Sequence, residues 1–144
     1  LTQEVAKWYS FNLNLNGYHN QINAFSVENK YPVPNTFSAV KQEIISGNIK
    51  LNNTFHLPKN FDAQLTAIYL APDIIPQGKI ANRFSLDIGV KKSLQKGKGE
   101  LFLNATDILN TMIIQKDILG QGFKYRSTDY YETQVIRLGY NYKF

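Results

Sequence analysis

The last nine residues, Ile136-Arg137-Leu138-Gly139-Tyr140-Asn141-Tyr142-Lys143-Phe144, place an apolar side chain at every second position up to the final one. Successive side chains of a β-strand point to opposite faces, so this pattern predicts a strand with one apolar face. A chain terminus normally frays into polar residues, whereas this stretch ends on an aromatic ring. The stretch therefore predicts an all-β fold.

Five earlier segments repeat this alternation, at 10–16, 48–57, 61–69, 83–91 and 101–106. Strands with one apolar and one polar face are typical of antiparallel sheets. All five prolines lie between these segments, where a missing N–H removes no ladder hydrogen bond. We predict an antiparallel up-and-down meander of about six strands. Two short stretches, 37–45 and 109–113, also fit a helical spacing, and we interpret them as strand extension or structured loop.

The connections between the predicted strands alternate in length. Residues 57–61 and 95–99 join their strands tightly, whereas the connections through 27–35, 72–82 and 109–129 are long. In an up-and-down sheet this alternation puts the short turns at one end and the long loops at the other. Outer-membrane barrels have this asymmetry. The pattern favours a segment of a transmembrane β-barrel.

Aromatic residues gather at the ends of the predicted strands. Trp8 and Tyr9 begin the first strand, and Tyr130 and Tyr131 precede the last. About a dozen residues of tilted strand cover roughly 25–30 Å, close to the height of a barrel's apolar band. We therefore predict that these four residues belong to aromatic girdles, with Trp8 and Tyr9 at the same end as Phe144.

The composition excludes several classes of function. The chain is 43% hydrophobic and 13% aromatic, which is too apolar for disorder. A net charge of +5 with scattered basic residues does not indicate nucleic-acid binding. There is no cysteine, and His19 and His56 have no catalytic partner at a recognisable spacing. We expect no enzymatic activity, no cofactor and no metal site.

The terminal residues resemble the β-signal of outer-membrane proteins, in which a final aromatic residue follows apolar or aromatic residues at alternate positions. The matching positions are Ile136, Leu138, Tyr140, Tyr142 and Phe144. The resemblance implies that the barrel-assembly machinery reads this strand during insertion. A physical reason is that such a strand pairs by edge addition while its lipid-facing side chains set the register.

Residues 83–144 resemble the C-terminal end of TonB-dependent receptors, through 83–92, 101–111 and the final strand. That family often has Asn-Leu-Phe-Asn where this chain has Asp107-Ile108-Leu109-Asn110. The resemblance implies the bacterial outer membrane, outer-membrane lipid as a partner, uptake of an unidentified small nutrient, and energy supplied by TonB through N-terminal parts missing here. No plug domain is recognised in the chain.

The predicted strand number suggests a piece of a larger barrel. Six strands fall short of the eight that small membrane barrels need. We therefore expect residues 1–144 to be a single all-β unit, the C-terminal part of a larger outer-membrane barrel. An isolated fragment would expose two strand edges, and such edges invite pairing with another copy.

Two other classes of protein fit the alternation. One is a soluble lipocalin-like β-barrel or sandwich that binds an apolar ligand, and the other is a surface β module without a transport role. The side on which the apolar faces lie separates them. Packing into one closed dry interior favours the soluble class, and an outward belt favours the membrane class. The marker residues are Phe11, Leu51, Leu65, Leu86 and Leu138.

Overall fold

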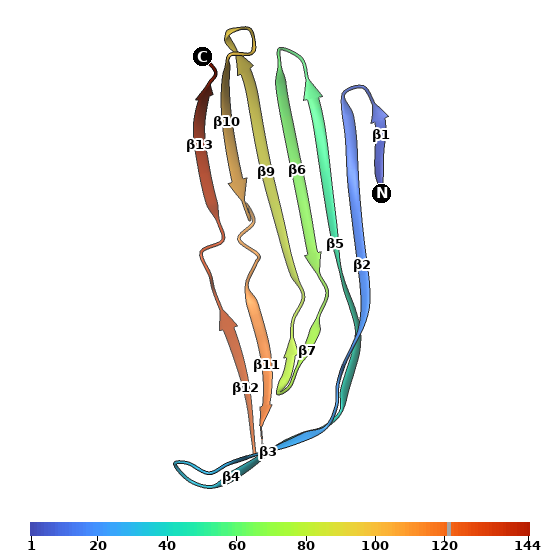
Figure 1. Ribbon diagram of the computed structural model, residues 1–144, viewed down its shortest axis with the longest axis vertical. Helices are drawn as coiled ribbons and strands as arrows, with labels where there is room; N and C mark the ends of the chain where they lie inside the picture. Colours follow the sequence, from blue (N-terminus) through green and yellow to red (C-terminus); the bar gives the residue numbers. More distant parts are fainter. Residues whose placement is uncertain (121) are drawn as a thin grey trace.

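The computed structural model describes residues 1–120 and 122–144, and this part of the chain is built almost entirely from antiparallel strands (Figure 1). The main sheet has the order β1-β2-β5-β6-β9-β10-β13. Its strands are β1 (Thr2–Ala6), β2 (Tyr9–Ile22), β5 (Gln42–Leu57), β6 (Phe61–Leu70), β9 (Arg83–Leu94), β10 (Gly99–Thr106) and β13 (Val135–Tyr142). Each strand follows its neighbour in sequence, apart from hairpins in the long connections, so the up-and-down meander is confirmed.

The remaining strands form a smaller sheet, of order β12-β11-β8-β7, and a separate β3-β4 hairpin. They are β3 (Phe25–Asn29), β4 (Asn35–Ala39), β7 (Asp73–Ile75), β8 (Gly78–Ile80), β11 (Ile114–Gly120) and β12 (Phe123–Asp129). One 3-10 turn, η1 (Gln95–Gly97), lies between β9 and β10. All six strands of the second group lie in the long connections.

The expected number of about six strands is wrong, because the described residues contain thirteen. All six expected strands are present, and β1 joins them in the main sheet. The sequence of β1, Thr-Gln-Glu-Val-Ala, lacks an alternating apolar pattern, and its edge position is defined only by its pairing with β2. The stretch 37–45 falls in β4 and the start of β5, and 109–113 lies outside the strands, as the interpretation of strand extension or structured loop allows. The other loop strands were not expected, since they pair mainly with one another.

Short and long connections lie at opposite ends of the main sheet, as predicted (Figure 1). The short turns at 7–8, 58–60 and 95–98 share one end with the C-terminus, and the long connections extend from the other end. In the turn at 58–60, Lys59 and Asn60 both have positive φ, 63° and 61°. Two successive left-handed residues match the right-handed twist of a tight hairpin.

The β2-β5 pair continues past the rest of the main sheet. Ten residue pairs join β5 to β6, from Asn48↔Leu70 to Leu57↔Phe61. Beyond Asn48 the main-sheet ladder continues only between β2 and β5, whose two-stranded ribbon curves away from the other strands (Figure 1). In this ribbon Gly17 faces Gly47. A Cβ at Gly47 would collide with the carbonyl oxygen of Asn16, so this close approach requires glycine.

Polar contacts hold the loop strands together. The hydroxyl of Tyr18 and the amide of Asn20, both on β2, donate to the Asp73 carboxylate at 2.8 Å each and hold the β7-β8 hairpin against β2. The hydrogen bond from Asn20 is the largest cause of a lowered pKa at Asp73. Arg126 contacts Asp117 at 2.7 Å across β11 and β12.

The described residues enclose no dry interior. Among them only Ala39 and Ile74 are buried apolar side chains, and both lie outside the main sheet. None of the five marker residues is buried, and Leu138 is 71% exposed. The condition for the soluble class is therefore not met. The part of the chain that the structure describes also has no helix long and apolar enough to cross a membrane.

Candidate functional site

The strand register divides the main sheet into two continuous faces. Residues directly opposite one another on antiparallel strands have their side chains on the same face. One apolar row across β6, β9, β10 and β13 is Leu65, Ile88, Ala105 and Ile136. The next row, one residue along each strand, is Gln64, Gly89, Asn104 and Arg137. One face is therefore an apolar belt and the other a polar wall.

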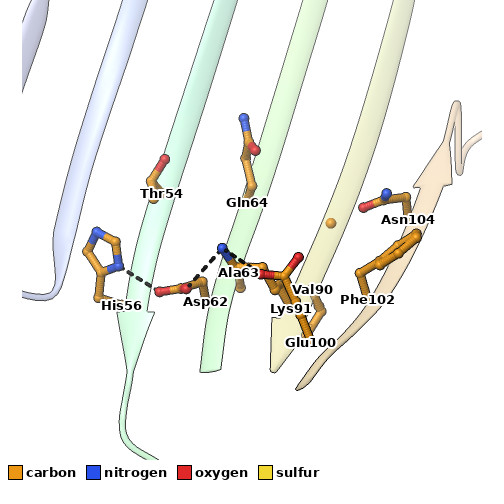
Figure 2. A pocket seen from close by; sticks show the side chains of 11 residues that line it. Thr54, His56, Asp62, Ala63, Gln64, Val90, Lys91, Glu100, Phe102 and Asn104 are labelled. Atoms are coloured by element: carbon orange, nitrogen blue, oxygen red, sulfur yellow. Dashed lines mark hydrogen bonds and ion pairs between the residues drawn. The ribbon is translucent and has the colours of Figure 1, made fainter. Parts of the chain in front are cut away.

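The polar wall carries a chain of charged groups across four strands near the short turns (Figure 2). His56 Nδ1 on β5 lies 2.7 Å from Asp62 Oδ1 on β6. The ammonium of Lys91 on β9 lies 3.7 Å from Asp62 and 3.5 Å from Glu100 on β10. Because the signs alternate, each group has an opposite charge or a hydrogen-bond partner beside it.

These groups line an open hollow of about 480 Å³ on the polar wall (Figure 2). Neutral polar side chains complete it, namely Thr54, Gln64 and Asn104. Its aromatic member, Phe102, lies opposite Gly139 on β13, and a Cβ at Gly139 would collide with the Phe102 ring. The hollow thus offers hydrogen bonds, both signs of charge and one aromatic surface to a polar solute.

The two histidines lie far apart, as expected from their positions in sequence. His56 belongs to the charged chain on the polar wall, whereas His19 faces Glu43 at 3.9 Å in the extended β2-β5 ribbon. Among the described residues, no three metal-ligating side chains gather into a cluster that could hold an ion.

Asp107, directly after β10, is the most deeply buried side chain of the described residues, at 2% exposed. Its carboxylate accepts hydrogen bonds from the backbone N–H groups of Thr111 at 3.0 Å and Met112 at 3.2 Å, and from the Thr133 hydroxyl. Its own N–H donates to Asp87 Oδ1 at 2.8 Å. This group of contacts, here named the Asp107 clasp, joins β9, β10 and the segment before β13.

The conformation of Asp107 explains why a short acidic or amide residue suits this position. Its φ of 44° is left-handed, a region that Asp and Asn tolerate better than most residues. Burial raises the pKa of the Asp107 carboxyl, but hydrogen bonds from Thr133, Thr111 and Met112 outweigh it and lower the pKa. The sequence pattern did not predict this structural role for Asp107. It drew attention to the segment only because Asp107-Ile108-Leu109-Asn110 stands where the receptor family often has Asn-Leu-Phe-Asn.

The predicted assembly-signal residues lie along the apolar belt. Ile136, Leu138, Tyr140 and Tyr142 on β13 stand opposite Ala105, Leu103, Leu101 and Gly99 on β10. The Tyr140 hydroxyl donates to Gln95 Oε1 at 2.8 Å and fixes the ring over Gly99. Phe144 lies past the end of β13 and packs edge-on against Tyr142, with 5.4 Å between ring centroids. In the described part of the chain β13 is the last strand of the main sheet, so this row of side chains runs along the sheet's edge.

The predicted girdle residues lie at both ends of the belt strands. Trp8 lies in the first short turn and Tyr9 begins β2, and both rings stack on Phe55, with centroid distances of 6.5 and 5.0 Å. Tyr130 and Tyr131 lie between β12 and β13, at the long-loop end of β13, and the Tyr130 hydroxyl donates to Asn110. The structure thus puts the two pairs at opposite ends, with Trp8 and Tyr9 at the end that holds Phe144.

A sheet with one exposed apolar face, one polar wall and asymmetric connections has the construction of a membrane barrel wall. Residues 1–142 match the outer membrane protein beta-barrel family. The chain belongs to this family, and its location is the bacterial outer membrane. No curated protein and no solved structure matches the chain significantly.

Cysteine labelling tests the two faces, because the chain has no cysteine of its own. Gln64 and Leu65 are neighbours on β6 that belong to the polar wall and the apolar belt. In the outer membrane, Gln64→Cys is expected to react with a charged maleimide, whereas Leu65→Cys reacts only after denaturation because lipid covers it. Equal labelling of the two variants in the folded protein would contradict the assignment.

Substitutions in the Asp107 clasp test its contribution to stability. Asp107→Ala is expected to lower the free energy of unfolding by about 2 kcal/mol, because three part-buried donors lose their acceptor. Asp107→Asn keeps one acceptor oxygen and is expected to lose less, and Thr133→Val removes one donor only. Urea unfolding of the full-length protein in lipid measures the series. Equal stability of Asp107→Ala and the parent protein would refute the role.

The lowered pKa of Asp107 gives the clasp a defined pH dependence. A carboxyl whose pKa is lower in the folded state stabilises the fold fully above its unfolded pKa. That contribution is lost as the pH falls through the folded pKa. The stability difference between the parent and Asp107→Asn is therefore expected to be constant near neutral pH and to shrink only at strongly acidic pH, as followed by urea unfolding.

Proposed function

We propose that this chain is the C-terminal part of the wall of a larger transport barrel, of the TonB-dependent receptor type, which takes up a small nutrient. The observation that carries the proposal is the polar wall. Its charged chain from His56 to Glu100 lies on the face opposite the apolar belt. In a barrel whose belt meets lipid, that wall lines the lumen.

Strand direction supports a larger barrel. Neighbouring strands of the seven-stranded main sheet are antiparallel, so β1 and β13 run in the same direction, toward the short-turn end (Figure 1). Closing the sheet by pairing these two edges would need a parallel ladder, which membrane barrels of this kind lack. A wall containing these strands therefore needs an odd number of further antiparallel strands. An isolated piece would expose both edges and would pair through them with other copies.

Transport by such a barrel needs energy from outside the wall. In the receptor type that residues 83–144 resemble, TonB supplies it through N-terminal parts of the full-length protein. The long connections, with their own hairpins and exposed aromatic side chains such as Phe25 and Tyr125, would contact the nutrient before it enters the lumen. The wall strands themselves would need no catalytic chemistry, cofactor or metal.

The barrel-assembly machinery is the proposed partner during insertion. It would read β13, whose side chains Ile136, Leu138, Tyr140 and Tyr142 form one exposed row and whose outer edge carries no strand in the described part of the chain. Phe144, fully exposed beyond this row, would complete the signal.

Uptake assays test the transport proposal. Labelled cobalamin, ferric siderophores and maltooligosaccharides serve as probes in cells with and without the gene. Uptake of at least one is expected to require both this protein and TonB. Lys91→Gln is expected to reduce that uptake several-fold by breaking the row of charged groups, whereas the matched change Lys7→Gln, in the short turn between β1 and β2, leaves it unchanged. Full uptake in cells without TonB would refute the receptor type.

A substitution at the last residue tests the assembly signal. Phe144→Gln in the full-length protein is expected to reduce the amount of folded barrel in the outer membrane several-fold, because the terminal aromatic contact is lost. Lys143→Gln, at the neighbouring position, is the control and is expected to assemble normally. Heat-dependent gel mobility of the membrane fraction measures folded protein. Normal assembly of Phe144→Gln would remove Phe144 from the signal.

A further inference from the structure

A second hollow lies at the short-turn end, between the turn at 58–60 and the turn at 95–98. Its volume is about 650 Å³. Lys59 from one turn and Lys96 from the other both line it, together with Asn60 and Ser93. The backbone N–H of Ser93 donates to the Asn60 carbonyl at 3.0 Å, and this hydrogen bond holds the turn at 58–60 against β9. The hollow thus has a fixed wall and exposed ammonium groups from two turns.

The charge balance at this end is positive. The three short turns of the described residues contain four lysines and no acidic side chain, namely Lys7, Lys59, Lys96 and Lys98. One carboxylate, Asp62, also lines the hollow, but it is already engaged by His56 at 2.7 Å and Lys91 at 3.7 Å. Lys59 and Lys96 have no carboxylate within ion-pair distance among the described residues. The hollow therefore suits an anionic group.

The hollow adjoins the apolar belt. Phe61 lines it and stands opposite Lys92 on the belt face, where the Lys92 ammonium lies 4.5 Å from the centroid of the Phe61 ring. Leu101 on β10 is the next residue in the same row. An anion with an attached apolar tail could place its head between Lys59 and Lys96 and its tail along this belt. Long basic side chains near aromatic rings at a membrane boundary favour this arrangement.

We propose that this hollow binds the headgroup of an anionic phospholipid in the membrane leaflet at the short-turn end. Lys59 and Lys96 contact the phosphate from the two turns, Lys92 adds positive charge at the edge of the belt, and the acyl chains lie against Phe61 and Leu101. The proposal rests on the membership of the outer-membrane barrel family and is independent of whether the barrel is TonB-dependent.

Lipid retention tests the site. The full-length protein is reconstituted in phosphatidylethanolamine discs that also contain either phosphatidylglycerol or phosphatidylcholine, and lipid retained after detergent exchange is measured by mass spectrometry. The parent protein is expected to retain phosphatidylglycerol several-fold better than phosphatidylcholine. The double variant Lys59→Gln, Lys96→Gln is expected to lose this preference. The control Lys30→Gln, Lys79→Gln removes the same charge at the long-loop end and is expected to keep it.

Two further measurements make each outcome decisive. Heat-dependent gel mobility shows whether the variants are folded, and a folded double variant that keeps the preference overturns the proposal. Equal loss in both double variants also overturns it, since net charge alone would then explain retention. Excess inorganic phosphate is expected to leave the retained phosphatidylglycerol unchanged. Its displacement by inorganic phosphate would identify free phosphate as the occupant and overturn the lipid assignment.

Discussion

The antiparallel ladder of the main sheet sets the two faces of the wall and the position of every charged group on them. Backbone hydrogen bonds join each strand only to its neighbours, and the register fixes which side chains share a face. A slip of one residue between β10 and β13 would move Leu138 from the apolar belt to the polar wall. The lipid-facing surface, the charged chain and the proposed assembly signal therefore all require the same register.

Turns and side-chain contacts at both ends of the strands maintain that register. At the short-turn end, the left-handed pair Lys59 and Asn60 closes a tight hairpin, and Tyr140 rests over Gly99 with its hydroxyl on Gln95. At the long-loop end, the Asp107 clasp joins β9 and β10 to the segment that enters β13. Among the described residues no second layer packs against the main sheet, so these contacts are not supplemented by a buried apolar core.

Sequence reasoning located the six alternating strands, the alternation of short and long connections, and the two faces of each strand. It missed β1 and the loop strands other than β4, because an edge strand or a loop hairpin carries no apolar face that must be buried. It placed His56, Asp62 and Lys91 on strands but could not show that they meet. Their distances depend on the register between β5, β6 and β9, which follows from the turn geometry at 58–60 and the long connection before β9.

The order of residues along single strands is enough to specify the strand period, the class of fold and the apolar character of the last strand. Side-chain alternation is a local property, so it is visible in the sequence of a single segment such as 136–144. The pairing of strands in three dimensions sets which rows cross the sheet, how Asp107 is buried, and that β1 and β13 run in the same direction at the two edges. Those features depend on contacts between residues that are distant in sequence, and a local pattern does not predict which distant residues pair.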